Sequence, residues 1–496
     1  MNRILHLLFI AALFFTACST PSKQEKPNII YIYADDMGYG DVGFNGQKYI
    51  KTPTLDKMAE EGIKFTDHYT GAPICAPARC ILMTGKHSGR SYIRNNFEMH
   101  DDDPYKSGQL PIPDEEETIA EMLKKAGYTT AAIGKWGLGS LASSGSPLKQ
   151  GFDFFYGYID QAHAHNHFPA YLFRNDQMVM TRNDSFHVHT RFDGDDPSDL
   201  SAYDKYKGPD YSLDLMTVEA KNFIQENKDK PFFLYLPYIV PHKALQVPDE
   251  SLAMYEGVFE EEPYLGGRGY SPHPKPLSAY AAMITRMDQK IGEILQLLKE
   301  LGLDENTLVM FSSDNGPASG GGLNTRFFES SGIFKGSKGS LYEGGIREPF
   351  IARWPGKIKA GRVADHVSAQ YDLKATLAEL VGVDPGDTDG ISFLPTLLGK
   401  DKEQKKHEYL YWEFSNGGGQ YAVRIGDMKG VWRNVSGSDV EKWEVYNLKD
   451  DPSETKDLAA EYPELVKRFS EIVKQRVPSH IDRWNFDKTT ASSQSN

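Results

Sequence analysis

A cysteine followed at fixed spacing by proline and arginine is the first candidate for chemistry in this chain. Cys75, Pro77 and Arg79 form the pattern Cys-x-Pro-x-Arg within residues 71–79. Pro77 restricts its own φ to about −65° and has no amide hydrogen, so the turn that carries the cysteine is rigid. If a helix begins here, Arg79 lies one helical turn after Cys75 and its guanidinium can point back at the sulfur. The alternative is a buried cysteine in a proline-rich loop.

Acidic side chains follow two apolar stretches that have the composition of buried strands. Asp35 and Asp36 come after residues 27–34, and Asp314 and Asn315 come after residues 307–312. Taken singly, Asp-Asn-Gly is a turn signal. Because the carboxyl ends of parallel strands meet at one edge of a sheet, we expect the two pairs to converge there. Three carboxylates and one amide oxygen are ligands suited to Ca²⁺ or Mg²⁺ rather than zinc.

Alternating strands and helices must position these residues. Buried strands are predicted over residues 27–34, 129–133, 231–238 and 307–312, and helices over residues 54–62, 118–127 and 278–301. This alternation predicts an α/β fold with a large, doubly wound mixed sheet between helices. After the charged segment 401–406 the pattern changes. Short strands at hairpin spacing (residues 409–414, 421–425, 430–433 and 443–447) and a helix at 462–475 predict a smaller antiparallel α+β subdomain.

The cysteine motif resembles the signature of the type I sulfatases, within the alkaline-phosphatase superfamily. In that signature the cysteine is oxidised after translation to Cα-formylglycine, and Thr-Gly-Lys at residues 84–86 extends the match. Residues 444–455 resemble the C-terminal signature of the same family. The resemblance covers roughly residues 27 to 458. It implies an alkaline-phosphatase-like fold and a sulfuric ester hydrolase.

Three further segments match sulfatase motifs and supply charged side chains. Residues 134–139 (Gly-Lys-Trp-Gly-Leu-Gly) place Lys135 on a sulfate oxygen, as the resemblance implies. Residues 238–242 supply His242, which the resemblance makes the acid that protonates the leaving group. Residues 334–349 place Lys338 on the sulfate. Each of these alone fits a solvated surface residue, and the order of the motifs along the chain argues against that interpretation.

The resemblance also implies a cofactor and a mechanism. Asp35, Asp36, Asp314 and Asn315 hold one divalent cation, usually calcium, which also binds the formylglycine made from Cys75. One hydroxyl of the hydrated formylglycine attacks sulfur, and the second allows sulfate to leave. Arg79, Lys135, Lys338 and the cation neutralise charge on the sulfuryl oxygens, and His242 protonates the departing alcohol. A maturation enzyme that generates formylglycine is therefore an expected partner.

One position departs from the family pattern. The family usually has histidine after Lys-Trp, and this chain has Gly137. The role of that histidine is then absent, filled by water or filled by another residue. The candidates for such a residue are His163, His165 and His167, which would share one face of a strand but need not do so in a loop. We expect His163 and His165 to contact sulfate or sugar. A second metal site and a purely structural role are the alternatives for this tract.

The amino terminus predicts export. Residues 1–17 carry Arg3 and then an apolar run too short to span a bilayer, as in a signal peptide. The following Cys18 resembles the lipidated cysteine of a bacterial lipobox, with Phe15 a departure from the usual leucine. We therefore expect a membrane-anchored lipoprotein, periplasmic or at the cell surface, and the alternative is an ordinary secretory signal. The predicted units are a signal peptide (1–17), a lipoprotein tether (18–26), the catalytic domain (27–400), the α+β subdomain (401–488) and a disordered tail (489–496).

Bulk properties narrow the function further. The formal net charge of −14 argues against nucleic-acid binding. The chain has three cysteines, Cys18, Cys75 and Cys80, so we expect no structural disulfide, and Cys80 has the character of a small buried hydrophobe. Aromatic and polar residues between 154 and 176 suit a sugar. We expect an exo-acting enzyme on sulfated galactose or N-acetylgalactosamine. A phosphonate or phosphate ester hydrolase of the same superfamily and a non-catalytic, lipid-anchored glycan-binding protein are the alternatives.

Overall fold

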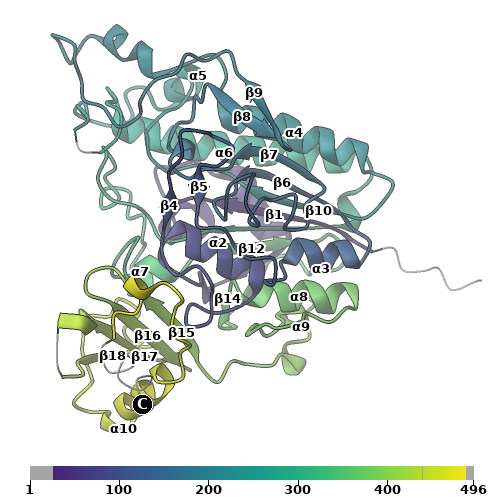
Figure 1. Ribbon diagram of the computed structural model, residues 1–496, viewed down its shortest axis with the longest axis vertical. Helices are drawn as coiled ribbons and strands as arrows, with labels where there is room; N and C mark the ends of the chain where they lie inside the picture. The colour runs from purple at the N-terminus through teal and green to yellow at the C-terminus, as the bar shows by residue number, and fades with distance from the viewer. Residues whose placement is uncertain (1–25, 268, 438–439, 488–496) are drawn as a thin grey trace, which may run out of the picture.

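The computed structural model describes residues 26–267, 269–437 and 440–487, and its centre is a sheet of ten strands (Figure 1). The strands lie in the order β13 (Arg362–Ala364), β2 (Ile63–Phe65), β12 (Phe350–Arg353), β11 (Thr307–Ser313), β1 (Asn28–Ala34), β10 (Phe232–Pro237), β6 (Thr129–Lys135), β7 (Phe154–Tyr158), β8 (Tyr171–Arg174) and β9 (Gln177–Met180). The run from β11 through β1, β10 and β6 to β7 is parallel. The pairs β11–β12, β12–β2, β7–β8 and β8–β9 are antiparallel, so the sheet is mixed.

The register of the central strands aligns their carboxyl ends. Ala34, the last residue of β1, pairs with Ser313, the last residue of β11. The loops that follow these strands therefore start side by side, and they carry Asp35 and Asp314. Lys135 is the last residue of the nearby strand β6. The parallel strands thus deliver side chains from three distant parts of the chain to one edge of the sheet.

Alternate residues of the buried strands face two different cores. In β1, Ile30 and Ile32 pack into one core and Tyr31 and Tyr33 into the other. Helices α1, α4 and α6 cover the first face, and α2, α3, α8 and α9 cover the second (Figure 1). Because both faces are covered, β1 is apolar along its whole length rather than at every second residue. The bounds of these helices are α1 Pro53–Glu61, α2 Cys75–Thr84, α3 Ile119–Lys125, α4 Ser212–Glu226, α6 Pro276–Glu300, α8 Asp372–Val381 and α9 Leu394–Leu397.

A second, antiparallel sheet lies at one end of the molecule (Figure 1). Its strands are β15 (Leu410–Phe414), β16 (Gln420–Ile425), β17 (Met428–Arg433) and β18 (Trp443–Asn447). One face packs on helix α10 (Pro463–Val473), and the other packs on residues of α2 and on Leu341 and Ile346. Short elements complete the chain: β3 (His68–Tyr69) with β14 (Ser368–Ala369), β4 (Glu98–Met99) with β5 (Gly108–Gln109), and the helices α5 (Asp249–Leu252) and α7 (Glu343–Ile346).

The predicted fold class is confirmed: a large mixed sheet between helices, with a separate small antiparallel sheet. The strands at both edges of the large sheet were not predicted. The boundary at residues 400 and 401 stays a prediction. The signal peptide (1–17), Cys18 and the tail (489–496) lie outside the described residues, as does most of the tether. No helix within the described ranges is both long and apolar enough to cross a membrane.

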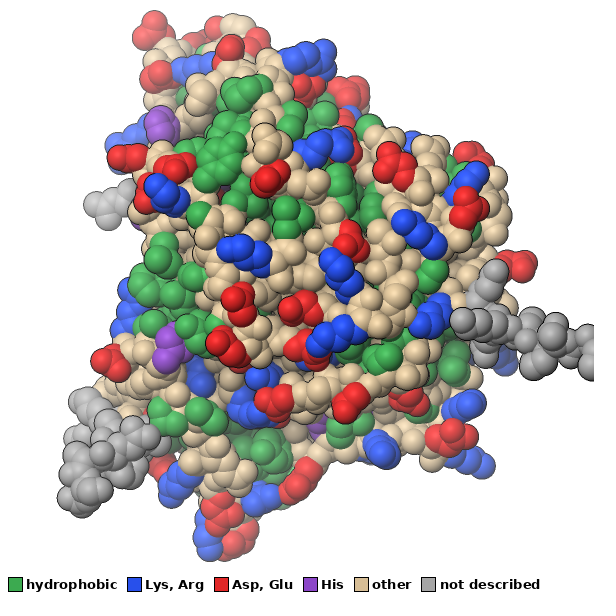
Figure 2. Space-filling view, turned by 45° about the vertical axis from the view of Figure 1, so that its right-hand side comes forward, with side chains coloured by type: hydrophobic (Ala, Val, Ile, Leu, Met, Phe, Trp, Pro, Cys, Tyr) green, Lys and Arg blue, Asp and Glu red, His purple; other side chains and the backbone are tan. Residues whose placement is uncertain are grey.

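The remaining two cysteines and the surface charge agree with the sequence analysis. Cys75 and Cys80 are buried and free, so the part of the chain that the structure describes has no disulfide. On the face that Figure 2 shows, acidic and basic side chains are interspersed, and no continuous basic area appears there. This face therefore offers no extended positive patch to an anion.

Candidate active site

Two consecutive carboxylates enter the site because the backbone turns sharply after β1. Asp36 has φ of 63°, in the left-handed region that only a few side chains adopt. Its amide donates to Asp314 Oδ1 over 3.0 Å, which links the loop after β1 to the loop after β11. The next amide, of Met37, donates to Ser313 Oγ over 3.0 Å. These bonds hold an unusual conformation that places Asp35 and Asp36 on the same centre.

Cys75 is the first residue of helix α2. The N-cap residue, Ile74, provides no side-chain cap, and Asn96 Oδ1 accepts from the amide of Ala76 over 3.1 Å. The positive end of the helix dipole lies at Cys75. The sulfur lies 3.6 Å from Asp35 Oδ1 and 3.3 Å from Lys338 Nζ. The residue is 2% exposed, and burial raises the pKa of the thiol to about 12. In the unmodified chain this thiol is therefore protonated at neutral pH.

Arg79 lies one turn further along α2, and its guanidinium points to Asp35 and Asp314. Its Nη2 donates to Asp314 Oδ2 over 2.9 Å and lies 3.4 Å from Asp35 Oδ2, and its Nη1 donates to the carbonyl of Lys135 over 2.8 Å. The side chain is fully buried. Because both Nη groups are engaged, Arg79 fixes the position of the two carboxylates rather than presenting a free cation.

Two lysines neutralise the consecutive aspartates. Lys135 Nζ donates to Asp35 Oδ2 over 2.6 Å, and Lys338 Nζ lies 2.6 Å from Asp36 Oδ1. Burial is the largest single influence and opposes ionisation of Asp35, but the charges of Lys135, His242, Arg79 and Lys338 together hold the pKa of that carboxyl well below its usual range. Burial and the charge of Asp35 raise the pKa of Asp314 to about 7. The three carboxylates are therefore matched by three cations, Lys135, Lys338 and Arg79.

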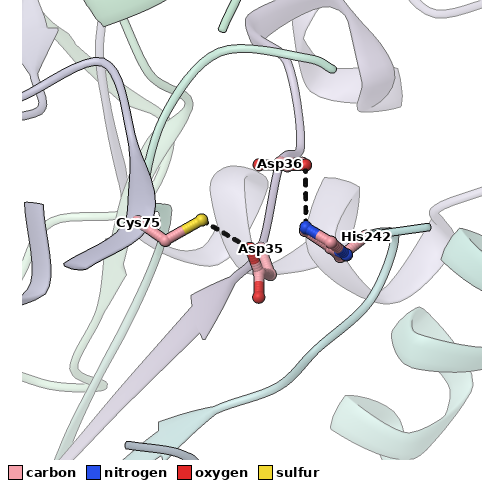
Figure 3. Close-up of side chains that lie close together, drawn as sticks. All are labelled: Asp35, Asp36, Cys75 and His242. Carbon is pink, nitrogen blue, oxygen red and sulfur yellow. Dashed lines mark hydrogen bonds and ion pairs between the residues drawn. The ribbon is translucent and has the colours of Figure 1, made fainter. Parts of the chain in front are cut away.

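His242 approaches the same centre from the loop after β10. Its Nδ1 donates to the carbonyl of Lys243, and its Nε2 lies 3.5 Å from Asp36 Oδ2. Figure 3 shows the ring directed at Asp36 and the sulfur of Cys75 directed at Asp35. One potential ligand atom from each of these four residues lies within 4.8 Å of the others. The structure thus brings His242 to the acidic centre.

The oxygens at this centre fit a hard divalent cation. Asp36 Oδ2 and Asn315 Oδ1 are buried and have no hydrogen-bond partner among the described residues. Buried acceptors without partners are rare unless an ion or water completes them. Asn315 Nδ2 donates to Asp36 Oδ1 over 2.8 Å, which leaves its carbonyl oxygen available. Together with Asp35 and Asp314 they form an oxygen set of the kind that calcium prefers.

The histidine tract is a 3-10 turn, η3 (His163–His165), so its side chains do not share a strand face. The ring of His165 stacks on the ring of His242, with centroids 4.7 Å apart and an angle of 7°. The ring of His163 stacks instead on Tyr171, at 4.3 Å. His167 is buried, and its Nε2 donates to the carbonyl of His242 over 2.8 Å. Of the two residues predicted to contact substrate, His165 is therefore the one that lies against His242.

The space beside Gly137 is filled by another side chain. Gly137 has φ of 76°, and a Cβ atom there would lie 2.9 Å from Gln161 Cγ. Gln161 is 3% exposed, and its Nε2 is buried without a hydrogen-bond partner in the described part of the chain. A histidine at position 137 would require both a left-handed backbone and displacement of Gln161. Gln161 thus occupies the place of the missing side chain.

Comparison with known proteins settles the family. The family model described as Sulfatase matches residues 27–383, and the model described as N-sulphoglucosamine sulphohydrolase, C-terminal, matches residues 332–478. The chain belongs to the sulfatase family. It is therefore a sulfuric ester hydrolase, as the motifs predicted, and this assignment is favoured over the phosphonate-hydrolase and non-catalytic alternatives.

Relatives of this sulfatase cover nearly its whole length. The N-acetylgalactosamine-6-sulfatase of Mus musculus is 32% identical over 96% of this chain and 90% of its own length. The N-acetylgalactosamine-6-O-sulfatase of Bacteroides thetaiotaomicron is 31% identical, with 95% and 98% covered. The solved structure of Ps i-CgsB in complex with k-i-k-neocarrahexaose has a TM-score of 0.73 and 28% identity, and covers 95% of this chain and 98% of that chain.

In this sulfatase the second sheet holds the segment that carries Lys338. Gln420 Nε2, on β16, donates to the carbonyl of Gly339 over 3.0 Å. Lys429, on β17, is fully buried and pairs with Glu343 at 2.8 Å and with Glu454 at 3.0 Å. Glu343 begins α7, shortly after Lys338 in the chain. The small sheet therefore helps to position Lys338 beside Cys75.

Sequence reasoning missed three residues near His242. Tyr270, Lys243 and His189 come from separate loops, and the ring of Tyr270 lies 6.0 Å from that of His242. Lys243 directly follows the motif that ends at His242, so of the three residues it lies closest in sequence to a motif that the sequence analysis used. Tyr270 and His189 stand in segments without a matching motif, so only packing reveals them.

Proposed function

We propose that this sulfatase removes sulfate from terminal sulfated galactose or N-acetylgalactosamine residues of glycans, using formylglycine made from Cys75 and one calcium ion. The names of the two curated relatives support an N-acetylgalactosamine sulfate substrate. The observation that carries the proposal is Cys75 at the start of α2, between Lys338 and Asp35. Because Cys75 is 2% exposed, a chain end reaches it more readily than an internal sugar does, which favours exo action.

The proposed groups supply chemistry that the unmodified side chains lack. Hydrated formylglycine at position 75 would supply a hydroxyl nucleophile and the second hydroxyl that sulfate release needs, and a bound calcium ion would supply positive charge for the sulfuryl oxygens. Asp35, Asp36, Asp314 and Asn315 would hold the ion. The two unpartnered oxygens, Asp36 Oδ2 and Asn315 Oδ1, support this assignment.

The chain's own cations bind and orient the sulfate group. Lys338 lies 3.3 Å from the sulfur of Cys75, so its ammonium contacts both the reacting group and a sulfuryl oxygen beside it. Lys135 contributes a second positive charge, 2.6 Å from Asp35. Such fixed charges stabilise a transition state without reorganisation. Arg79 acts as a positioning residue, because its guanidinium is engaged with Asp35 and Asp314.

His242 is the residue that we assign to protonate the leaving alcohol. Burial holds the pKa of its imidazole well below the usual range, so binding of the anionic substrate has to raise that pKa before Nε2 carries the proton. Its Nδ1 is fixed by the carbonyl of Lys243, so its Nε2 is the atom directed into the centre. A proton on Nε2 is within reach of the oxygen of a sulfate ester that lies beside Asp36. We assign sugar contact to His165, since its ring covers that of His242. A substrate contact of His163 stays a prediction, because its ring packs on Tyr171.

One experiment tests both the modification and the substrate. Protein made in its native host is digested, and the peptide that contains Cys75 is analysed by mass spectrometry for formylglycine. The same preparation is assayed with 2-, 3-, 4- and 6-sulfated galactose and N-acetylgalactosamine. We expect formylglycine and sulfate release from one of these sugars. Unmodified cysteine in folded protein, together with no release from any sugar, would contradict the proposal.

We also propose export, lipidation of Cys18 and maturation by a formylglycine-generating enzyme. The sequence of residues 1–17 and the cysteine that follows them support export and anchoring. Metabolic labelling with an alkyne-modified fatty acid tests this, with Cys18→Ser as the control variant. Label on the parent chain and none on the variant is the expected result. Equal labelling of both would refute lipidation at this residue.

A further inference from the structure

Lys243 is held rigidly beside the active site. It directly follows His242, and its ammonium donates to the carbonyl of Ser319 and lies 5.2 Å from the ring centroid of Tyr270. Gly321 closes the other side of this slot, since a Cβ atom there would lie 2.6 Å from Lys243 Cδ. Because its stem is enclosed, the ammonium of Lys243 loses little conformational freedom on contact with a ligand.

The charge of Lys243 is not neutralised. Lys135 and Lys338 each pair with an aspartate, but no acidic side chain within the described ranges forms an ion pair with Lys243. Burial lowers the pKa of its ammonium, while the charge of Asp36 raises it and that of Lys338 lowers it. A partly buried cation without a counter-charge is uncommon, and here its remaining hydrogen atoms are available to an anion.

The position of Lys243 points to the sugar rather than to the ester under attack. Tyr270 connects it to the histidines, with ring centroids 5.3 Å from His165 and 4.8 Å from His189. His165 Nδ1 and His189 Nε2 are 3.2 Å apart, and His189 Nδ1 donates to the carbonyl of Gly269. These rings form one wall on the side of His242. The leaving sugar must depart on that side if His242 protonates it.

We propose that Lys243, held between Tyr270 and the Ser319 carbonyl, binds a second anionic group of the substrate. This inference rests on the proposed function, because it assumes that the leaving sugar lies against His242. The chemistry that Lys243 recognises is a sulfate or a carboxylate near the ester that is cleaved. The substrates are then polyanionic glycans, either doubly sulfated sugars or sulfated sugars joined to a uronic acid.

Selectivity between singly and doubly charged substrates tests the proposal. The activated enzyme, its Lys243→Gln variant and a Lys51→Gln control are assayed on three sugars. These are N-acetylgalactosamine 6-sulfate, the 4,6-disulfate, and the 6-sulfate joined to glucuronic acid. Lys51 is the matched control, because its ammonium also lies over a tyrosine ring, 5.9 Å from the centroid of Tyr255. We expect Lys243→Gln to lower the ratio of kcat/KM for a dianionic over the monosulfated sugar by about tenfold, and the control to keep it.

A loss confined to the 4,6-disulfate identifies the second group as a sulfate. A loss confined to the sugar joined to glucuronic acid identifies it as a carboxylate. An unchanged ratio for both dianionic sugars would overturn the proposal, as would an equal loss on all three. Calorimetric titration of the same dianionic sugars into inactive Cys75→Ser protein, with and without Lys243→Gln, gives a second measurement. If the active enzyme cleaves none of the sugars, the proposed function fails. The difference in dissociation constant still decides the role of Lys243: about tenfold supports it, and no difference overturns it.

Discussion

Replacing Lys429 by methionine tests how the second sheet supports the segment that carries Lys338. Lys429 Nζ lies 2.8 Å from Glu343 and 3.0 Å from Glu454, and all three side chains are 0% exposed. Methionine keeps an unbranched chain of similar length but removes the charge. Glu343 and Glu454 then share a buried space without the cation between them. Burial raises the pKa of Glu454 to about 7, so above that pH the two like charges repel strongly.

The expected loss in the free energy of unfolding depends on which charges remain around Glu343 after Lys429 is replaced. Removing one partner of a buried ion pair costs about 3–5 kcal/mol. Burial raises the pKa of Glu343, but Lys429 and Arg347 lower it to about 2, so this carboxylate depends on both cations. Arg347 still pairs with Glu343 at 3.0 Å in the variant, so we expect the lower end of the range, about 3 kcal/mol. By contrast, Arg433→Gln breaks an exposed pair with Glu444 and should cost at most about 1 kcal/mol.

Urea unfolding followed by tryptophan fluorescence measures these costs, because Trp412, Trp432 and Trp443 all lie in the second sheet. A second variant, Lys429→Met with Glu454→Gln, removes the uncompensated charge and should recover about 1–3 kcal/mol. In conditions where it is folded, the single variant should also lose activity, since the segment of Lys338 is less well held. A cost below about 1 kcal/mol for Lys429→Met, or no recovery in the double variant, would refute the reasoning.

Three further predictions concern pH, metal and backbone. Burial lowers the pKa of His68 to about 3, so the unfolded state binds the additional proton, and stability is lost as pH falls from about 6.5 toward 3. His68→Phe should reduce the dependence of the free energy of unfolding on pH in this range by up to about 1.4 kcal/mol per pH unit, as measured by urea unfolding at several pH values. An unchanged dependence on pH would show that buried His68 is not its cause. Removing calcium with a chelator should lower the melting temperature of the parent protein. In Asp36→Asn the melting temperature should be the same with and without the chelator. Equal melting temperatures of the parent protein with and without calcium argue against the metal site. Gly137→His should destabilise by about 1–3 kcal/mol because of its left-handed backbone and the contact with Gln161, and Gln161→Ala should partly restore stability; a neutral Gly137→His contradicts this account.

Several features of the site were predictable because they depend on local sequence. Asp35 and Asp314 follow apolar runs, and the carboxyl ends of parallel strands meet at one edge whichever helices connect them. Arg79 reaches the centre because Cys75 begins a helix, which fixes the direction of a side chain one turn away. The place of these residues was therefore set by the strand and helix periods.

Other contacts join segments that no local pattern relates. Lys429 and Glu343 are separated by 86 residues, and the sequence around either one does not indicate that it pairs with the other. The antiparallel strands β8 and β9, of which β9 is the edge strand, carry partly exposed residues, so their sequence lacks the apolar run that marks β1. Pairing of this kind depends on which surfaces meet when the chain is compact.

The sequence by itself determined the family, the fold class and the residues that surround Cys75, because strand ends and helix turns place side chains through local geometry. Only the tertiary structure decided that His165 rather than His163 lies on His242, that Gln161 fills the space at Gly137, and that Lys243 has no ion-pair partner among the residues that the structure describes. These outcomes depend on side chains from separate loops competing for the same space. Which side chain occupies the space depends on packing in the folded protein and cannot be predicted from the order of residues along the chain.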